Sequence, residues 1–489
     1  MTAKTDLVTL EGSGLIQVAS LEPELEYLFR HALVQDAAYG SLLRQDRRAL
    51  HRRAAEAVLA LYPERVRELA GVIAMHLEEA GDDPTEYLVM AGEHALERFA
   101  NREAAAFFER AVARVPAGDV PRAALRLRAA LGSTKAGWTF GPFDSRIAAL
   151  EQAAGADAGV DQRLLADAYF WIAFLRRFRG ETPDSSPELA RALERLAAIG
   201  ESVGDPKARA VPQAFMGVGM VFTGQPRAGA ELLERSLATM EDGGDQISAA
   251  LLSDVLTIAY ARLGEFEKAE RSLERSTRLA DKGDAIARLD AMIARSGIAI
   301  ERGELREGEQ LASQCALQSE ELGAPACAVG SNMLAGYARL SLNEARSAEQ
   351  PLERGREFAA LVNNPRMVNL AQGLLSSVKG RLGDLPGALA GWDASLESVR
   401  RMHDRQQEAI IRWQRAQTRA HDATPDWPAV LDDLDAAVAL FEGIEARPAL
   451  ARVLRDRAQA LRALGRADNA DAAQRRSAEI AGALGLRDF

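Results

Sequence analysis

Residues 296–315, SGIAIERGELREGEQLASQC, contain the pattern that decides the fold. Gly303 interrupts a helical pattern, and small residues stand seven positions before it (Ser296), five after it (Gly308) and twelve after it (Cys315). Two helices joined by a short turn can approach closely only where the residues at their contact are small. The stretch therefore predicts two antiparallel helices packed tightly against each other.

The same pattern recurs with a step of about 40 residues. The turn residues are Gly224, Gly264, Gly303, Asn343, Gly383 and Gly465, and the last step spans two repeats with a small insertion near Pro425. The positions at the three offsets carry no large side chain and are Gly217, Thr257, Ser296, Gly336, Ser376 and Ala458, then Gly229, Ala269, Gly308, Ala348, Ala388 and Ala470, then Ser236, Ser276, Cys315, Gly355, Ser395 and Ser477. A fixed period of this length is typical of a helical repeat array.

These offsets resemble the tetratricopeptide repeat, with hairpins longer than that family's usual 34 residues and with the large aromatic early in the first helix mostly absent. Weaker hairpin patterns extend the array toward the amino terminus. The resemblance implies an all-α fold, a right-handed α-solenoid of about nine antiparallel helical hairpins over residues 84–484, with 485–489 as a tail. Each hairpin buries its apolar face against its neighbours.

The segment before the array has helical periodicity in residues 29–58, FRHALVQDAAYGSLLRQDRRALHRRAAEAV, and in 61–82, LYPERVRELAGVIAMHLEEAGD. Together with the array that follows, it resembles the stretch after the ATPase core in bacterial signal-transduction ATPases with numerous domains, among them cyclase-associated and LuxR- or maltose-activator-type regulators. The resemblance covers about residues 7–115. It implies a small winged-helix-like remnant with connecting helices over 1–83, followed by a repeat sensor arm.

Nucleotide chemistry within this chain is not expected. A phosphate-binding loop needs GxxxxGK[ST], and the sequence has no Gly-Lys dipeptide. In the resembling ATPases a histidine at a position like His31, beside Arg30, approaches the bound nucleotide, so here that role would need a phosphate loop from another chain. Otherwise His31 caps or packs the first helix.

Arginines and a histidine recur at helical spacing in Arg44, Arg47, Arg48, His51, Arg52 and Arg53. Such a run can contact DNA phosphates, or it can be the solvated face of a helix. The net charge of −11 and the pI near 5.3 argue against broad nucleic-acid binding.

Motifs that carry catalysis or metal binding are missing. HExxH, GxSxG, paired CxxC and DxDxDG do not occur, and GVGMVFTG at 217–224 lacks the dinucleotide-binding spacing. We expect Cys315 and Cys327 to be small buried residues. No catalytic residue, cofactor or metal is predicted, no apolar run is long enough for a membrane span, and the low cysteine content together with the absence of a leader pattern predicts a cytoplasmic protein.

The remaining candidate for function is the concave groove, which the first helix of each hairpin lines in tetratricopeptide arrays. The candidate residues are Phe222, Ile258, Arg262, Tyr337 and Arg381, which could bind an acidic peptide or amphipathic helix or could simply pack between repeats. The sequence therefore predicts a non-catalytic regulatory or scaffold protein that binds a protein, peptide or small effector in signal transduction or transcription control. A separate ATPase or cyclase chain is among the expected partners, and a nucleic-acid-binding regulator that uses the Arg-rich segment is the alternative.

Overall fold

The computed structural model describes residues 3–20, 26–140, 144–155, 159–179, 181, 183, 185–202, 206–241 and 246–488. The chain forms two compact units, Met1–His94 and Ala95–Phe489, and each is considered separately below. The expected domain boundary between residues 83 and 84 falls just before helix α5 (Thr85–Glu97), whereas the two compact units meet within that helix.

The first unit combines helices with one small β-hairpin. Its elements are α1 (Ala3–Gly12), β1 (Ile16–Ser20), β2 (Glu26–Phe29), α2 (Ala32–Ser41), α3 (Arg44–Leu61), the 3₁₀ turn η1 (Pro63–Arg65) and α4 (Val66–Ala80). The strands are antiparallel, with Ile16 opposite Phe29 and Val18 opposite Tyr27. Helices α3 and α4 pack on each other. The periodicity indicated the helices of this unit, but the hairpin was not predicted.

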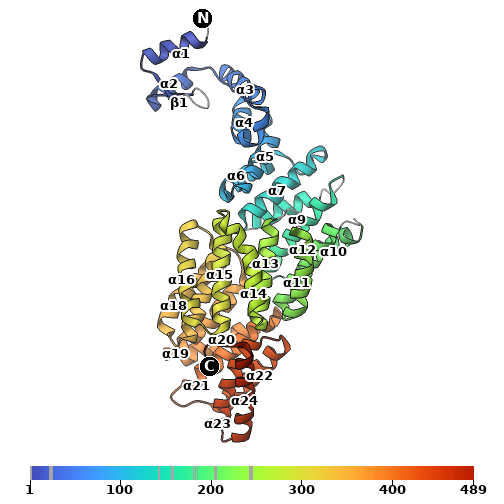
Figure 1. Ribbon diagram of the computed structural model, residues 1–489, viewed down its shortest axis with the longest axis vertical. Helices are drawn as coiled ribbons and strands as arrows, with labels where there is room; N and C mark the ends of the chain where they lie inside the picture. Colours follow the sequence, from blue (N-terminus) through green and yellow to red (C-terminus); the bar gives the residue numbers. More distant parts are fainter. Residues whose placement is uncertain are drawn as a thin grey trace. The chain divides into compact units, whose positions relative to one another are not determined.

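The second unit is a run of helix pairs. After α6 (Asn101–Arg114) and the 3₁₀ turn η2 (Val120–Arg122), nine pairs follow in the described residues. They are α7 (Ala123–Gly137) with α8 (Asp144–Ala154), α9 (Gln162–Phe178) with α10 (Pro187–Ser202), α11 (Pro206–Thr223) with α12 (Pro226–Glu241), α13 (Gln246–Leu263) with α14 (Phe266–Asp281), α15 (Ala285–Arg302) with α16 (Leu305–Leu322), α17 (Pro325–Ser341) with α18 (Ala345–Leu361), α19 (Pro365–Arg381) with α20 (Leu385–Arg401), α21 (Arg405–Ala420) with α22 (Trp427–Gly443), and α23 (Arg447–Ala463) with α24 (Ala467–Leu484). Figure 1 shows the pairs following one another in sequence order from cyan to red. The all-α solenoid expected from the repeat is confirmed.

The turn residues explain the sharp reversals within the pairs. Gly224, Gly264, Gly303, Asn343, Gly383 and Gly465 all have positive φ, between +63° and +103°. This left-handed conformation ends a helix without steric cost for glycine and with little cost for asparagine. A second series, not recognised in the sequence, has positive φ between successive pairs at Gly283, Gly323, Asn363, His403 and Glu445. The turns within the pairs and the turns between them therefore both contain a residue in the left-handed conformation.

The small positions are where the two helices of a pair touch. All eighteen predicted positions are buried. A Cβ added at Gly217 would lie 2.9 Å from the carbonyl oxygen of Gly229, and the Ser296 hydroxyl donates a 2.7 Å hydrogen bond to the carbonyl oxygen of Gly308. The steric prediction drawn from 296–315 is confirmed, and Cys315 is one of these buried contacts.

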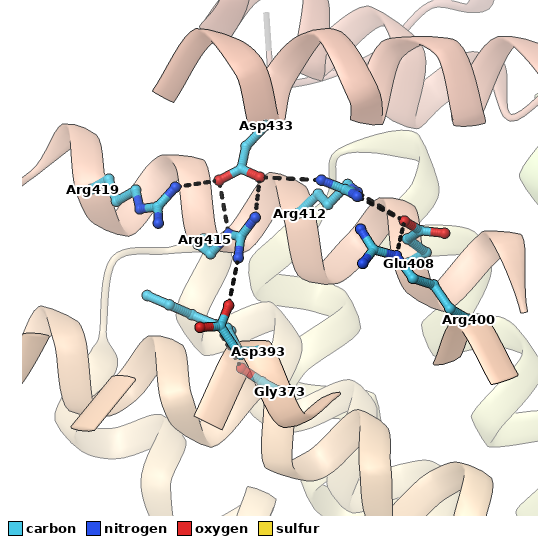
Figure 2. Close-up of polar contacts among 9 residues, drawn as sticks. Gly373, Asp393, Arg400, Glu408, Arg412, Arg415, Arg419 and Asp433 are labelled. Carbon is cyan, nitrogen blue, oxygen red and sulfur yellow. Dashed lines mark hydrogen bonds and ion pairs between the residues drawn. The ribbon is translucent and has the colours of Figure 1, made fainter. Parts of the chain in front are cut away.

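The α21/α22 pair, which lacks a recognisable turn residue, is held by charges as well. Asp433 of α22 is 2% exposed and accepts hydrogen bonds from Arg412, Arg415 and Arg419, which lie along one face of α21. Figure 2 shows these three guanidinium groups around the single carboxylate. Arg412 also binds Glu408, so the charges are shared across a network and the buried carboxylate is fully compensated.

The pairs wind into a superhelix whose successive turns touch. Helix α13 contacts α23, and α11 contacts α21, so each meets a helix five pairs further along the chain. Arg227, at the start of α12, binds Glu445, which precedes α23, at 2.8 Å. Near the other end, the backbone N–H of Ala326 donates to the carbonyl oxygen of Thr139 at 3.4 Å. The inner surface of the superhelix is therefore surrounded by protein.

We expect Gly336→Leu to destabilise the protein by about 1–3 kcal/mol or more, because overpacking a close helix contact forces the backbone apart. A Cβ at this position would already lie 2.5 Å from Leu352 Cδ2. The matched control is Ser347→Leu, at an exposed position on α18 of the same pair. Thermal melting should separate the two variants clearly, and equal melting temperatures would refute the proposed close contact.

Candidate functional site

The superhelix of the second unit surrounds a partly open cavity of about 600 Å³. Its walls come mainly from the first helices of the pairs, α9 to α23, as expected for a tetratricopeptide-like array. Cavities of this size hold drug-sized ligands. The apolar lining includes Phe174, Phe178, Val218, Ile258, Ile293, Met333, Tyr337, Leu370, Ile410, Trp413 and Phe441.

Helical spacing puts one stripe of each inner helix on the cavity wall. On α13 the stripe is Asp254, Ile258, Ala261 and Arg262, and on α15 it is Asp290, Ala294, Gly297 and Glu301. Residues three, four, seven and eight apart share a helix face, so these residues point the same way. Both stripes therefore begin with an aspartate and end with a charged residue.

Arginines concentrate on one part of the wall. The Nη1 atom of Arg262 is buried and finds no hydrogen-bond partner among the described residues. Burial and the nearby Arg366 lower the pKa of Arg262 to about 10. Burial and Arg366 also lower the pKa of Arg177, which donates to the carbonyl oxygen of Glu181. Arg366 forms an ion pair with Asp404 at 2.6 Å. Arg262, with its unpaired Nη1 atom, is therefore the guanidinium group best placed to bind a ligand.

Two carboxyl groups, Asp254 and Asp290, lie on a different part of the wall. Asp254 Oδ1 is buried and has no hydrogen-bond partner in the described part of the chain. Burial and the charge of Asp290 raise the pKa of Asp254, and burial raises the pKa of Asp290. The Cys327 thiol donates to Asp290 Oδ1 at 3.5 Å. These acids are positioned to accept a cationic or hydrogen-bond-donating group.

A third cluster, Arg452 with Glu301 and Asp488, joins residues from distant parts of the chain. Arg452 binds Asp488 through Nε at 2.6 Å and Nη2 at 3.1 Å, and it also donates to the carbonyl oxygen of Glu301 at 2.9 Å. The backbone N–H of Arg487 donates to the carbonyl oxygen of Arg302. Residues 487–488, predicted to be part of a tail, are thus built into the wall of the superhelix.

The predicted groove residues are only partly brought together. Ile258, Arg262 and Tyr337 line the same cavity. Arg381 lies behind the wall and donates to the carbonyl oxygen of Leu340 at 2.6 Å and to Gln417, which does line the cavity. The side chain of Phe222 lies outside the described residues. A binding role for these residues stays a prediction.

Arg30 and His31 are exposed in the first unit. His31 occupies the N-cap position of α2, where its carbonyl accepts from Val34 N, while its side chain makes no capping hydrogen bond. This backbone arrangement favours the capping interpretation, although it leaves the ring accessible.

Much of the Arg44–Arg53 run is engaged within the first unit. Arg52 makes a two-point ion pair with Asp82, and the Arg47 guanidinium lies 5.0 Å from the centre of the Tyr39 ring. His51 Nδ1 lies 2.8 Å from Nδ1 of His76, whose pKa burial lowers. These intramolecular contacts weaken the case for a phosphate-binding face.

Other chemistries find no support in the described ranges. No group of three metal-ligating side chains lies together there, and residues 217–223 belong to helix α11 rather than following a strand. No helix of the described chain has the length and apolar character to cross a membrane.

Sequence reasoning missed Asp254, Asp290, Arg177 and Arg452. A signal existed for the first of these, because Asp254 interrupts the otherwise apolar stretch ALLSDVLTIAY at 250–260. A buried charge in such a helix normally has a partner or a function. The contact between Arg452 and Glu301 could not be predicted from a local sequence pattern, because the two residues are more than a hundred positions apart in the chain.

Comparisons with known proteins agree with the fold. No protein-family model matches the sequence, and no curated protein matches it. A crystal structure of a Rap protein complexed with Competence and Sporulation Factor has a TM-score of 0.57 at 12% identity, covering 75% of this chain and 99% of that one. A Rap conjugation gene regulator in complex with the Phr* peptide has a TM-score of 0.48 at 10% identity, covering 76% and 97%.

A signal-transduction ATPase with numerous domains and a tetratricopeptide repeat sensor, from Pyrococcus horikoshii, has a TM-score of 0.39 at 13% identity, covering 93% of this chain and 66% of that one. With the helix pairing and the small contact residues, the first of these similarities defines the class. The chain is a tetratricopeptide-like helical repeat protein.

The acidic pair should make the protein less stable as the pH rises. A carboxyl whose pKa is raised on folding binds more protons in the native state than in the unfolded state, so the free energy of unfolding falls as the pH rises above about 4. Asp284, Cys315 and Cys327 are the other titratable groups near Asp290. In Asp290→Asn, the melting temperature should fall less steeply between pH 5 and 8. The control is Asp281→Asn, which is exposed, and parallel curves for wild type and Asp290→Asn would contradict this assignment.

Arg452→Ala should destabilise the protein by about 3–5 kcal/mol, because it leaves the partly buried Asp488 carboxylate without its ion pair and removes one of the two cations near Glu301. The Arg452 side chain is 9% exposed. Arg447→Ala, at an exposed position on the same helix, should stay within about 0.5 kcal/mol of wild type. Urea unfolding measures both variants. Equal midpoints would show that residues 487–488 do not hold the superhelix closed.

Proposed function

We propose that this chain is a non-catalytic regulatory protein that binds a short peptide inside the repeat superhelix. The observation that carries the proposal is the cavity itself, whose apolar walls surround a buried guanidinium atom and a buried carboxyl oxygen without hydrogen-bond partners in the described chain. Unpaired buried polar groups cost stability unless something pairs with them. A bound ligand would provide these partners.

The similarity to solved repeat proteins supports the same assignment. The Rap protein of similar fold was solved with Competence and Sporulation Factor bound. A binding protein of this class needs no catalytic residues of its own, because binding acts by shifting the population of conformations. We therefore place the chain in signal transduction or transcription control in the cytoplasm, with the conformation of the superhelix as its output.

The first unit supports a finer proposal about partners. Its segment FRHALVQDAAY, within residues 29–39, resembles the module that follows the ATPase core in signal-transduction ATPases with numerous domains. His31 is exposed in the structure and can approach a nucleotide held by a separate ATPase or cyclase chain. Nucleic-acid binding is less well supported, because Arg47 and Arg52 already contact Tyr39 and Asp82.

Gly297→Phe tests the cavity as the binding site. Gly297 lines the cavity in the middle of α15, and a Cβ there would meet nothing within 4 Å. The phenyl ring should fill the space and reduce peptide retention at least about tenfold, a loss that corresponds to about 1.4 kcal/mol. The measurement incubates purified protein with a random library of three- to five-residue peptides and identifies those that co-elute on size exclusion by mass spectrometry.

The matched control is Gly297→Ala, which leaves the cavity nearly unchanged. It should retain peptides as wild type does and melt at a higher temperature, since alanine stabilises a helix interior by about 0.5–1 kcal/mol relative to glycine. If wild type retained no peptide, or Gly297→Phe retained as much as wild type, peptide binding in this cavity would be excluded.

A further inference from the structure

The cavity wall carries ionisable side chains of both signs, and some of their buried polar atoms have no hydrogen-bond partner in the described residues. Arg262 and Asp254 both belong to α13, and each has a buried polar atom without a hydrogen-bond partner in the described structure. We propose that the cavity binds a peptide by its two free ends, with the carboxylate at Arg262 and the ammonium at Asp254 and Asp290. This inference rests on the proposed function and specifies its ligand.

The two charges cannot satisfy each other. Asp254 and Arg262 are eight residues apart on one helix, which places their Cα atoms about 12 Å apart along the axis at 1.5 Å per residue. A direct ion pair within a helix needs a spacing of three or four residues. Both groups therefore face the cavity as separate points of attraction.

The arginine end is suited to a carboxylate. A guanidinium presents a planar fork of donors that matches a carboxylate in a two-point contact. Arg366 lies near enough to act on the charge of Arg262, and it acts on the charge of Arg177 as well. Two acids act on Arg262: Asp404, which forms an ion pair with Arg366, and Glu301, which also lies near Arg452. An incoming anion would thus meet an excess of positive charge.

The aspartate end is suited to an ammonium group. Two carboxyl groups close together disfavour a second negative charge, and a cation between them relieves this repulsion. The other polar groups near the pair are the thiol of Cys327, a weak donor beside Asp290, and the hydroxyl of Ser276 beside Asp254, and both are neutral. The pair therefore lacks a cationic partner among the described residues that contact it, and a ligand ammonium would supply one.

The spacing sets the length of the ligand. An extended residue spans about 3.3–3.6 Å, so a separation of about 12 Å corresponds to three or four residues between the charged ends. Between the two ends, the stripe presents Val255, Ile258 and Ala261, and Ile293 and Gly297 line the cavity from α15. The expected ligand is a tri- or tetrapeptide, or one slightly longer if bent, with apolar side chains and unblocked termini.

The test compares four forms of one peptide library. Random tri- to pentapeptides built from Ala, Val, Leu, Phe and Ser are prepared with free ends, with an acetylated amino terminus, with an amidated carboxyl terminus, or with both ends blocked. Each library is incubated with the full chain, and retained peptides are counted by mass spectrometry after size exclusion. We expect either single block to reduce retention at least about tenfold, the factor that corresponds to losing about 1.4 kcal/mol.

Two variants assign each end to its residue. Arg262→Gln should lose the discrimination between carboxylate and amide while keeping that between ammonium and acetyl, and Asp254→Asn should show the reverse. The exposed Arg288→Gln and Asp281→Asn serve as matched controls and should behave as wild type. Both variants replace a side chain whose charged form is disfavoured by burial with a neutral side chain of similar polarity, so each should melt at or above the wild-type temperature. A clear drop would show that the charge is already paired in the free protein, and it would overturn the proposal.

The remaining outcomes separate this inference from the proposed function. If blocked and free peptides are retained equally by wild type and lost in Gly297→Phe, the cavity binds peptides but not by their ends, so the inference alone fails. If no library is retained, or retention survives in Gly297→Phe, peptide binding in the cavity fails and the inference falls with it.

Discussion

Close contact between the two helices of each pair is the constraint on which the rest of the structure depends. At the contact points the backbones approach so nearly that an added Cβ at Gly217 would meet the carbonyl oxygen of Gly229 at 2.9 Å. Repeating this contact every 40 residues or so produces units of nearly equal size. Units of equal size stack with a constant rotation, and a constant rotation makes a superhelix.

The cavity is a consequence of that superhelix. Helices five pairs apart touch, so the inner face of the array surrounds a partly open cavity. The ion cluster of Arg452, Asp488 and Glu301 joins the closing edges, and the pair between Arg227 and Glu445 does the same nearby. Binding inside such a space can be transmitted through the closing contacts, because changing the curvature of the array must alter them.

Buried polar atoms without hydrogen-bond partners on the cavity wall distinguish this interior from an ordinary core. Where a buried charge serves only structure, the protein surrounds it completely, as it does Asp433 with three arginines (Figure 2). By contrast, Arg262 Nη1 and Asp254 Oδ1 have no hydrogen-bond partner in the described residues. Asp433 is fully paired within the protein, whereas Arg262 and Asp254 each keep an unpaired polar atom on the cavity wall. This contrast supports a ligand site in the cavity.

The sequence by itself determined the pair and its period, because small residues at fixed offsets and a residue that tolerates positive φ are local requirements. It also placed Ile258, Arg262 and Tyr337 on the inner helix face, since that face follows from helical spacing. The closure of the superhelix, the role of Asp488 and the burial of Asp254 were decided only by the tertiary structure. These features depend on contacts between helices five pairs apart. Such contacts form only when the small rotations between successive repeats add up to a full turn, and no local sequence pattern specifies the total rotation.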